Sequence, residues 1–420
     1  MRFHQSRLSS VHVEEVLSSQ MPQSKHDEPA REGVPGAIIL GNEYQALGLL
    51  RRLSAVGVKC VLIDQDAYGP ALFSRFRTQF YRSPSYQSIQ FWPWLSSLAR
   101  AKGYVGWIII PTDDEQVRQL AENFDEAQSL FRYVGLPWKS YQHIYNKRQA
   151  QVLATGLGVS VPKAFIPNRR SDFPKPDEME YPLIIKPAFK REFSKVSKKK
   201  AIVAKSPEHL QRILNGPLRT VPIEQLLYQE LIPGDGSNQW SYCGFFVDGE
   251  PIAAFTACRR RQKPPDFGRA STYVQAAYDE EVERQSRKVL AAIKYTGLAE
   301  VEWKRDARDH KLKFLEVNAR CWGWHMLASR VVGNLPLMLY DYLVEGTVRR
   351  VEPHYGPKWV KWITDIPVSV HVLARRKLSI LEYVNDLKGD VVSCEWDRSD
   401  PLPFFLQIVL LPYLILRRGY

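Results

Sequence analysis

The residues best suited to chemistry are two carboxylates, one amide and one guanidinium between positions 302 and 320. Glu302 and Glu316 each lie within an apolar segment, and Asn318 and Arg320 follow the second of these segments at alternate positions. A carboxylate inside an apolar strand is costly unless a cation neutralises it. Carboxylate and amide oxygens are ligands that suit Mg²⁺, and a guanidinium can hold a phosphate or carboxylate through two hydrogen bonds. These residues predict a magnesium site beside a bound anion; the alternative is a surface hairpin with solvated acids.

Two lysines and one strand end could complete a site for a phosphate-bearing ligand. Lys186 terminates the hydrophobic run LIIKP, and Lys147 stands just ahead of a predicted helix. Either could be an ordinary surface lysine. The apolar segment ending in Glu230 continues into Leu-Ile-Pro-Gly and then Asp235. Backbone groups of such a segment can read an adenine edge, while a nearby acid accepts hydrogen bonds from ribose hydroxyls.

Two kinds of secondary-structure pattern must position these side chains. Apolar runs at 37–41, 58–64 and 104–110, with a helical pattern at 44–56, predict a doubly wound α/β unit over the first 140 residues. Its first loop lacks GxGxxG, which argues against a dinucleotide site. After residue 158 short strands with hairpin turns predict an α+β arrangement of antiparallel pairs.

Charge favours small anionic partners. The chain has 420 residues, with 58 Lys+Arg against 45 Asp+Glu and a net charge of +13. Much of the excess lies in two short stretches, 186–205 and 258–270, which suits a small anionic ligand better than a nucleic-acid track. The alternative is a pair of solvated surface loops. The five cysteines show no CxxC spacing, so the sequence predicts neither a disulfide framework nor a zinc site.

The two ends of the chain differ in character. Residues 1–33 are polar and predict a flexible tail rather than a signal peptide. Residues 402–416 are strongly apolar, contain two prolines, and are followed by Arg417 and Arg418. That run is shorter than the ~20 residues that span a bilayer. We expect a helix packed on the body; the alternative is a peripheral membrane contact with a basic flank.

The order of these pieces resembles the ATP-grasp superfamily, and within it the carboxylate-amine ligases related to D-aspartate ligases and carbamoyl-phosphate synthase large chains. The resemblance covers roughly residues 36–346. It implies a Rossmann-like pre-ATP-grasp domain, a two-lobed ATP-grasp domain and a helical C-terminal extension. The corresponding boundaries are 34–140, 141–346 (smaller lobe 141–230, larger lobe 231–346) and 347–420.

The resemblance also implies roles for single residues. Lys147 and Lys186 match the lysines that hold the α- and β-phosphates, and Arg320, with Lys186, matches the groups that stabilise the transferred phosphate. The remaining matches are the adenine hinge at Gln229, Glu230, Leu231 and Ile232, the ribose acid at Asp235, the metal ligands Glu302, Glu316 and Asn318, and the substrate-side loop at Arg261. His325, with Trp322 and Trp324 beside it, is interpreted as a packing residue; the alternative is a contact with the substrate. The stretch 186–200 contains no glycine, unlike the glycine-rich loop of many relatives, so lysines such as Lys198, Lys199 or Lys200 are expected to clamp the phosphates.

The resemblance therefore implies an ATP-dependent ligase that joins a carboxylate to an amine through an acyl phosphate and releases ADP. Its cofactors would be ATP and two Mg²⁺ ions, with Mn²⁺ as a substitute, and its partners small molecules rather than nucleic acid. A cytoplasmic location, membrane-associated if the C-terminal segment contacts lipid, and a homodimer are expected. The alternative function is an ATP-binding sensor or partner protein that has lost catalysis.

Overall fold

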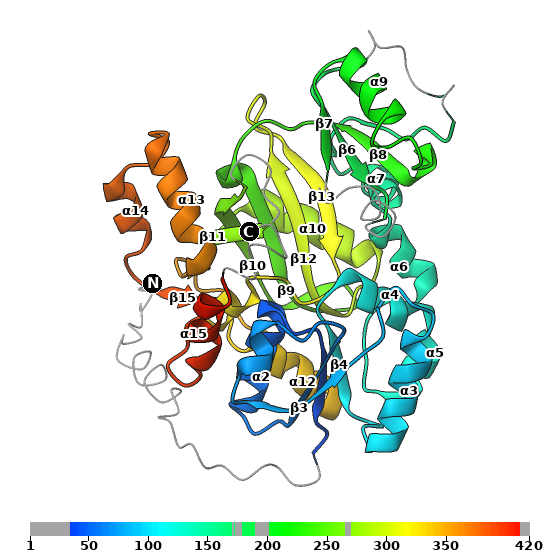
Figure 1. Ribbon diagram of the computed structural model, residues 1–420, viewed down its shortest axis with the longest axis vertical. Coiled ribbons are helices and arrows are strands. Elements are labelled where there is room, and N and C mark those ends of the chain that lie inside the picture. The colour runs from blue at the N-terminus through cyan, green and yellow to red at the C-terminus, as the bar shows by residue number, and fades with distance from the viewer. Residues whose placement is uncertain (1–33, 170–171, 173–178, 190–200, 265–269, 412–420) are drawn as a thin grey trace, which may run out of the picture.

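The computed structural model describes residues 34–169, 172, 179–189, 201–264 and 270–411, which form three β-sheets with helices packed around them (Figure 1). Three predictions concern residues outside this part of the chain. They are the flexible tail over 1–33, the phosphate-clamping lysines among 190–200, and the end of the apolar segment after residue 411.

The first sheet is parallel, with its four strands in the order β3-β2-β1-β4. Its inner strands are buried along their whole length, as expected of strands covered on both faces. This arrangement confirms the predicted α/β unit. Its elements are β1 (Ala37–Leu40), α2 (Tyr44–Ser54), β2 (Cys60–Asp64), η1 (Pro70–Phe73), β3 (Arg77–Arg82), α3 (Phe91–Lys102), β4 (Ile108–Pro111), α4 (Asp114–Glu122) and α5 (Phe124–Leu130).

A small antiparallel sheet follows, in the order β5-β8-β6-β7. Its apolar side packs on α9, whose residues Leu210, Ile213 and Leu214 are buried against it. The elements of this part are α6 (Trp138–Tyr145), α7 (Lys147–Gly156), β5 (Ala164–Phe165), β6 (Leu183–Pro187), β7 (Ile202–Ala204), α9 (Pro207–Asn215), η4 (Ile223–Gln225) and β8 (Leu226–Glu230).

The large sheet has seven strands in the order β13-β12-β9-β10-β11-β14-β15 and lies at the centre of the molecule (Figure 1). One of its faces packs on α10, where the indole of Trp303 donates to the Ser286 hydroxyl at 2.7 Å. The elements contributed by the middle of the chain are η5 (Gly236–Asn238), β9 (Gln239–Val247), β10 (Glu250–Lys263), β11 (Ala270–Ala276), α10 (Glu280–Ala292), β12 (Gly297–Arg305), β13 (Leu312–Asn318), η6 (His325–Leu327), α11 (Ala328–Val331) and α12 (Leu335–Glu345).

The C-terminal part is mainly helical, as predicted, and it also extends the large sheet by two strands. Its elements are β14 (Lys358–Val360), α13 (Trp362–Ala374), α14 (Ile380–Asp386), β15 (Val391–Ser393) and α15 (Leu402–Val409). The expected helix from Leu402 is present and is held to the body by a hydrogen bond between Gln407 and Tyr44. Among the described residues, no helix is both long and apolar enough to cross a bilayer. The boundaries between the structural units, near residues 140, 230 and 346, stay predictions.

A buried ion pair joins the two ends of the described chain. The carboxylate of Asp400 accepts from Arg51 Nε at 3.0 Å, from the Ser74 hydroxyl at 2.7 Å and from the Arg75 backbone N–H at 3.0 Å. Arg51 also donates to the backbone oxygen of Glu395 at 3.0 Å. Because the buried charges are paired and hydrogen-bonded, the C-terminal part is fixed against the first sheet.

Helix α2 docks closely on the segment that follows β13. A Cβ atom added at Gly48 would lie 2.6 Å from the His325 ring and 2.7 Å from Met326 Cγ. Nearby, the Arg52 guanidinium donates to the Ser329 hydroxyl at 2.9 Å. The absence of a side chain at Gly48 therefore sets how closely the first sheet approaches the large one.

We predict that Gly48→Ala destabilises the protein by about 1 to 3 kcal/mol, because the added methyl group forces two packed elements apart. Gly156→Ala, in α7, is the matched control, since nothing lies within 4 Å of its added Cβ. There the higher helix propensity of alanine should leave stability unchanged or raise it. Chemical denaturation of both variants checks this, and equal stability of Gly48→Ala and the parent would contradict the close docking.

Candidate active site

The pairing of β12 with β13 gathers four polar side chains on one face of the large sheet. Glu300 lies opposite Asn318, and Glu302 lies opposite Glu316. Residues two apart on a strand, and cross-strand partners, point to the same face. The intervening Val301 points to the other face and packs in the core beside α10. The register of β12 and β13 thus brings residues that are 14 to 18 positions apart in the chain into one cluster.

Two cations neutralise the pair of opposed carboxylates. Arg259 Nη2 contacts Glu302 Oε2 at 3.1 Å, and Lys147 forms an ion pair with Glu316. Like charges directly opposite each other on paired strands are destabilising. The two carboxylates can share this face because each has a cation beside it.

Glu300 is a site residue that the sequence reasoning missed. It is buried, and its carboxylate accepts from the Ser241 hydroxyl at 2.9 Å and from Asn318 Nδ2 at 3.1 Å. Burial, followed by the charge of Glu302, raises the pKa of Glu300 to about 7. The signal was available, since the alternation that selects Glu302 also selects the residue two positions before it.

The Asn318 amide connects the acids to the arginine. Its Nδ2 also donates to Glu302 Oε1 at 2.8 Å, while its Oδ1 accepts from Arg320 Nη2 at 2.9 Å. The nitrogen, rather than the oxygen, therefore faces the carboxylates. An oxygen ligand for a metal beside Glu302 requires this amide to turn by half a rotation about its last bond.

Arg320 is held by a carboxylate from the first sheet. Its Nε contacts Asp114 Oδ1 at 2.6 Å, and its Nη1 donates to the Cys321 backbone oxygen at 3.2 Å. Burial lowers the pKa of Arg320, but the charge and hydrogen bond of Asp114 more than offset this, so the net shift is upward. Sequence reasoning missed Asp114, although it directly follows a parallel strand, where functional groups of α/β sheets gather.

Each predicted phosphate lysine interacts with a different acid of the cluster, Lys147 with Glu316 and Lys186 with Glu302. Lys147 begins α7, and its backbone N–H donates to the Ala188 oxygen at 3.1 Å, which ties α7 to the end of β6. Lys186, in β6, is half-buried. Burial lowers the pKa of Lys186 to about 8, and the charge of Glu302 offsets part of that shift.

The predicted adenine hinge is the chain crossing from the small sheet to the large one. Gln229 and Glu230 end β8, and Leu231 and Ile232 follow. The Glu230 carboxylate accepts hydrogen bonds from the Lys163 backbone N–H at 2.8 Å and from Arg308 at 2.6 Å. These contacts stabilise the segment that connects the two sheets.

Asp235, the predicted ribose acid, lies farther along the same crossing. Its carboxylate accepts from the backbone N–H of Ser237 at 2.8 Å and from the hydroxyl of Ser237 at 2.7 Å. In this position Asp235 caps the short helix η5.

Arg261 has a structural role instead of the substrate contact that the sequence suggested. It forms two hydrogen bonds of 3.0 Å to Asp365, contacts Asp386, and stacks on Tyr273 at 4.0 Å. It is buried with these partners. The guanidinium therefore fastens α13 and α14 to β10 and β11, because its planar donors match the Asp365 carboxylate.

His325 likewise packs in the interior rather than facing the acidic cluster. It is buried, its Nδ1 lies 3.0 Å from the Trp322 backbone oxygen, and its ring touches the site of Gly48. Burial lowers the pKa of His325 to about 4, which keeps the ring neutral at physiological pH. This places His325 at the docking surface of α2, as its interpretation as a packing residue predicts.

The donor set fits a hard divalent cation that takes most of its ligands from elsewhere. Within the described part of the chain, no cluster of three or more His, Cys, Asp or Glu side chains is placed to hold a metal. Glu302 and Glu316 provide two carboxylates on one face. Mg²⁺ commonly uses one or two carboxylates and completes its shell with phosphate oxygens and water. The site therefore suits Mg²⁺ bound together with phosphates.

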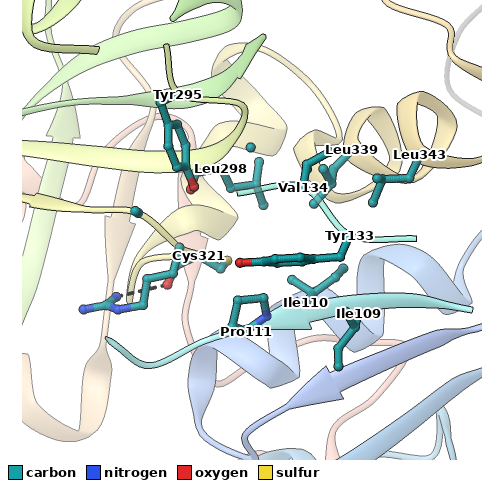
Figure 2. Close-up of a pocket in the computed structure, with 13 residues that line it drawn as sticks. Ile109, Ile110, Pro111, Tyr133, Val134, Tyr295, Leu298, Cys321, Leu339 and Leu343 are labelled. Atoms are coloured by element: carbon teal, nitrogen blue, oxygen red, sulfur yellow. Dashed lines mark hydrogen bonds between the residues drawn. The ribbon is translucent and has the colours of Figure 1, made fainter. Parts of the chain in front are cut away.

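Two cavities border the cluster. One is lined by Lys147, Glu316, Asn318, Asp114, Tyr141 and Tyr145. The other is mainly apolar and lies between β4, α12 and the start of β12, with the hydroxyl ends of Tyr133 and Tyr295 pointing towards it (Figure 2). Arg320 lines this second cavity. The arginine thus lies where the first sheet, the acidic cluster and open space meet.

Comparisons with known proteins found a matching family and a related sequence. Residues 258–343 match the family described as the carbamoyl-phosphate synthase L chain, ATP binding domain. The D-aspartate ligase of Enterococcus faecium is 21% identical over 298 residues, which cover 67% of this chain and 70% of the relative.

Two solved structures show a similar fold. The L-amino acid ligase of Bacillus licheniformis has a TM-score of 0.55 and 14% identity, with 76% of this chain and 75% of that chain covered. The N5-carboxyaminoimidazole synthetase of Staphylococcus aureus, complexed with ADP, has a TM-score of 0.60 and 13% identity, with 79% and 83% covered. The fold and these matches confirm the resemblance to ATP-grasp ligases found in the sequence: the chain shares their fold and is similar to D-aspartate ligase and, over residues 258–343, to the ATP-binding domain of the carbamoyl-phosphate synthase large chain.

Proposed function

We propose that the protein is an ATP-dependent ligase that joins a small carboxylic acid to an amine. The observation that carries this proposal is the face of β12 and β13 on which Glu302, Glu316 and Asn318 meet, with Arg320 bonded to Asn318. The similarity to D-aspartate ligase and to an L-amino acid ligase supports the same reaction class.

In the proposed reaction the carboxylate oxygen attacks the γ-phosphorus of ATP, the bond to the β-phosphate oxygen breaks, and ADP leaves. The amine then attacks the acyl carbon, inorganic phosphate leaves, and the amine nitrogen loses a proton. Two Mg²⁺ ions, or Mn²⁺, would supply charge neutralisation between the phosphates. No side-chain nucleophile is required, so positioning and electrostatic stabilisation by the protein account for catalysis.

Each site residue has a role in this proposal. Lys147 and Lys186 hold the α- and β-phosphates, and Arg320 stabilises the transferred phosphoryl group and the acyl phosphate. Glu302 and Glu316, with Asn318 after its amide turns, bind the metal ions. The cations now beside the carboxylates support this assignment, because they show that the cluster requires positive charge.

The nucleotide would bind where the two lobes join. Residues 229–232 contact adenine through their backbone, and Asp235 binds the ribose. Small molecules are the expected partners, while a homodimer and a cytoplasmic location stay predictions.

Release of ADP with Mg²⁺-ATP, measured against acids and amines singly and in pairs, tests the function. We expect release that depends on one acid and one amine together. Stabilisation by Mg²⁺-ATP without turnover on any pair, across a broad panel of amino acids and small carboxylates, would favour the sensor. No stabilisation by the nucleotide would contradict the nucleotide site itself.

Glu316→Gln should lower ATP turnover by at least about a hundredfold while the protein stays folded, because it removes a charged metal ligand. The matched control is Glu345→Gln, an exposed change at the end of α12 that should leave turnover unaltered. Steady-state kinetics and thermal melts of both variants check this. Turnover by Glu316→Gln within a few-fold of the parent would rule out its metal role.

Lys186→Met should stabilise the ligand-free protein at pH 7 and abolish the stabilisation that Mg²⁺-ATP provides. Since the pKa of Lys186 is lowered to about 8 in the folded state, its charge destabilises folding below pH 8, and this penalty fades as pH rises from 8 towards 10.5. The gain at pH 7 should be about 1 to 3 kcal/mol.

Lys163→Met, an exposed change in the same lobe, serves as the control. It should neither stabilise the ligand-free protein nor abolish the stabilisation that Mg²⁺-ATP provides. Denaturation curves at pH 7 and pH 10, with and without nucleotide, measure both effects. A Lys186→Met protein that is less stable than the parent at pH 7, or that is still stabilised by Mg²⁺-ATP, would contradict the assignment.

A further inference from the structure

Exposed apolar side chains concentrate in the C-terminal part of the chain. Of the seventeen large hydrophobic side chains that are exposed among the described residues, ten lie between Ile366 and Val409. Figure 1 shows the helices that carry most of them, α13, α14 and α15, along one side of the molecule, with α13 and α14 projecting from the body. A concentration of this kind marks a contact surface rather than the scattered exposure that is normal for a soluble protein.

Helix α13 has its polarity reversed. Its polar residues Asp365 and Ser369 are buried and hydrogen-bonded to each other, and Asp365 also binds Arg261. Its residues Ile366 and Val370 are 52% and 60% exposed. A helix on the surface of a soluble protein normally turns its apolar side inwards, so the outer side of α13 is built for a partner that excludes water.

Helix α14 shows the same reversal. Asp386 points inwards to Arg261, whereas Ile380 and Leu381 are 73% and 69% exposed.

Helix α15 repeats the pattern on the neighbouring element. The only polar side chain between Leu402 and Val409, Gln407, is buried on Tyr44, while Phe405 and Val409 face outwards. All three helices therefore present apolar side chains outwards, and each turns at least one polar side chain inwards.

The apolar surface is bordered by positive charge. Arg375, Arg376, Lys377 and Lys388 are exposed on and beside the α13–α14 hairpin, and none of the ion pairs found among the described residues involves them. Two exposed acids lie among them: Glu382 takes part in the capping box of α14, and Asp390 pairs with Arg330. Aliphatic side chains surrounded by arginine and lysine are the composition that binds at the interface of an anionic membrane.

We propose that α13, α14 and α15 form a peripheral docking surface for an anionic lipid membrane. A second copy of the chain is disfavoured as the occupant, because a twofold contact would bring the same basic residues of both copies together. The inference is independent of the reaction, since α13 packs mainly on β10 and β11 and α15 mainly on η1, whereas the acidic cluster lies on β12 and β13.

Sedimentation of the full chain with vesicles tests the proposal. We expect binding to phosphatidylcholine vesicles that contain phosphatidylglycerol, weak binding to phosphatidylcholine alone, and release by salt. Replacing Arg375, Arg376 and Lys377 together by alanine should lower partitioning by on the order of a hundredfold, and Leu381→Glu should lower it at least tenfold. Ile89→Glu, at a still more exposed apolar site on the first α/β unit, should bind like the parent.

Circular dichroism and thermal melts check that each variant is folded. If Leu381→Glu does not fold, the alanine variant still decides the test. The absence of binding to either vesicle, or unchanged binding by the folded variants, would overturn the proposal. Light scattering tests the other occupant. If the protein self-associates without binding vesicles, and Leu381→Glu abolishes the self-association, the surface is an interface between copies and the proposal is overturned.

Discussion

The antiparallel register of β12 and β13 is the constraint on which the site depends. By placing Glu302 directly opposite Glu316 and Glu300 opposite Asn318, it puts three carboxylates and one amide on a single face of a sheet. That arrangement is electrostatically unfavourable by itself, since like charges oppose each other in a partly buried place. The other residues of the site supply the positive charge and the hydrogen bonds that this register requires.

Those partners come from three separate parts of the chain. Lys147 comes from the helix before the small sheet, and Arg259 comes from β10, which β9 separates from β12. Asp114, at the start of α4 beside the first sheet, holds Arg320. Each partner is fixed by packing of its own element. Because Arg320 is shared between Asn318 and Asp114, the first sheet takes part in the site and does more than support it.

The placement of two candidate substrate residues in the interior has one physical cause. Arg261 and His325 both have side chains whose chemistry suits a binding site, and both lie near residues that do meet there. In the fold, Arg261 meets the buried Asp365 of α13, and His325 meets Gly48 of α2. Both contacts join segments distant in the chain, so local sequence could not distinguish an interior partner from a ligand.

The sequence by itself determined the strands, their alternation and the types of side chain on them, because burial patterns and residue chemistry are local. It therefore indicated Glu302, Glu316, Asn318 and Arg320, both lysines and the ATP-grasp architecture. Only the tertiary structure decided which groups lie beside them: Glu300 as a third acid, Asp114 as the partner of Arg320, and the Asn318 nitrogen facing the carboxylates. These depend on register and on docking between sheets, which are set by contacts over long chain separations.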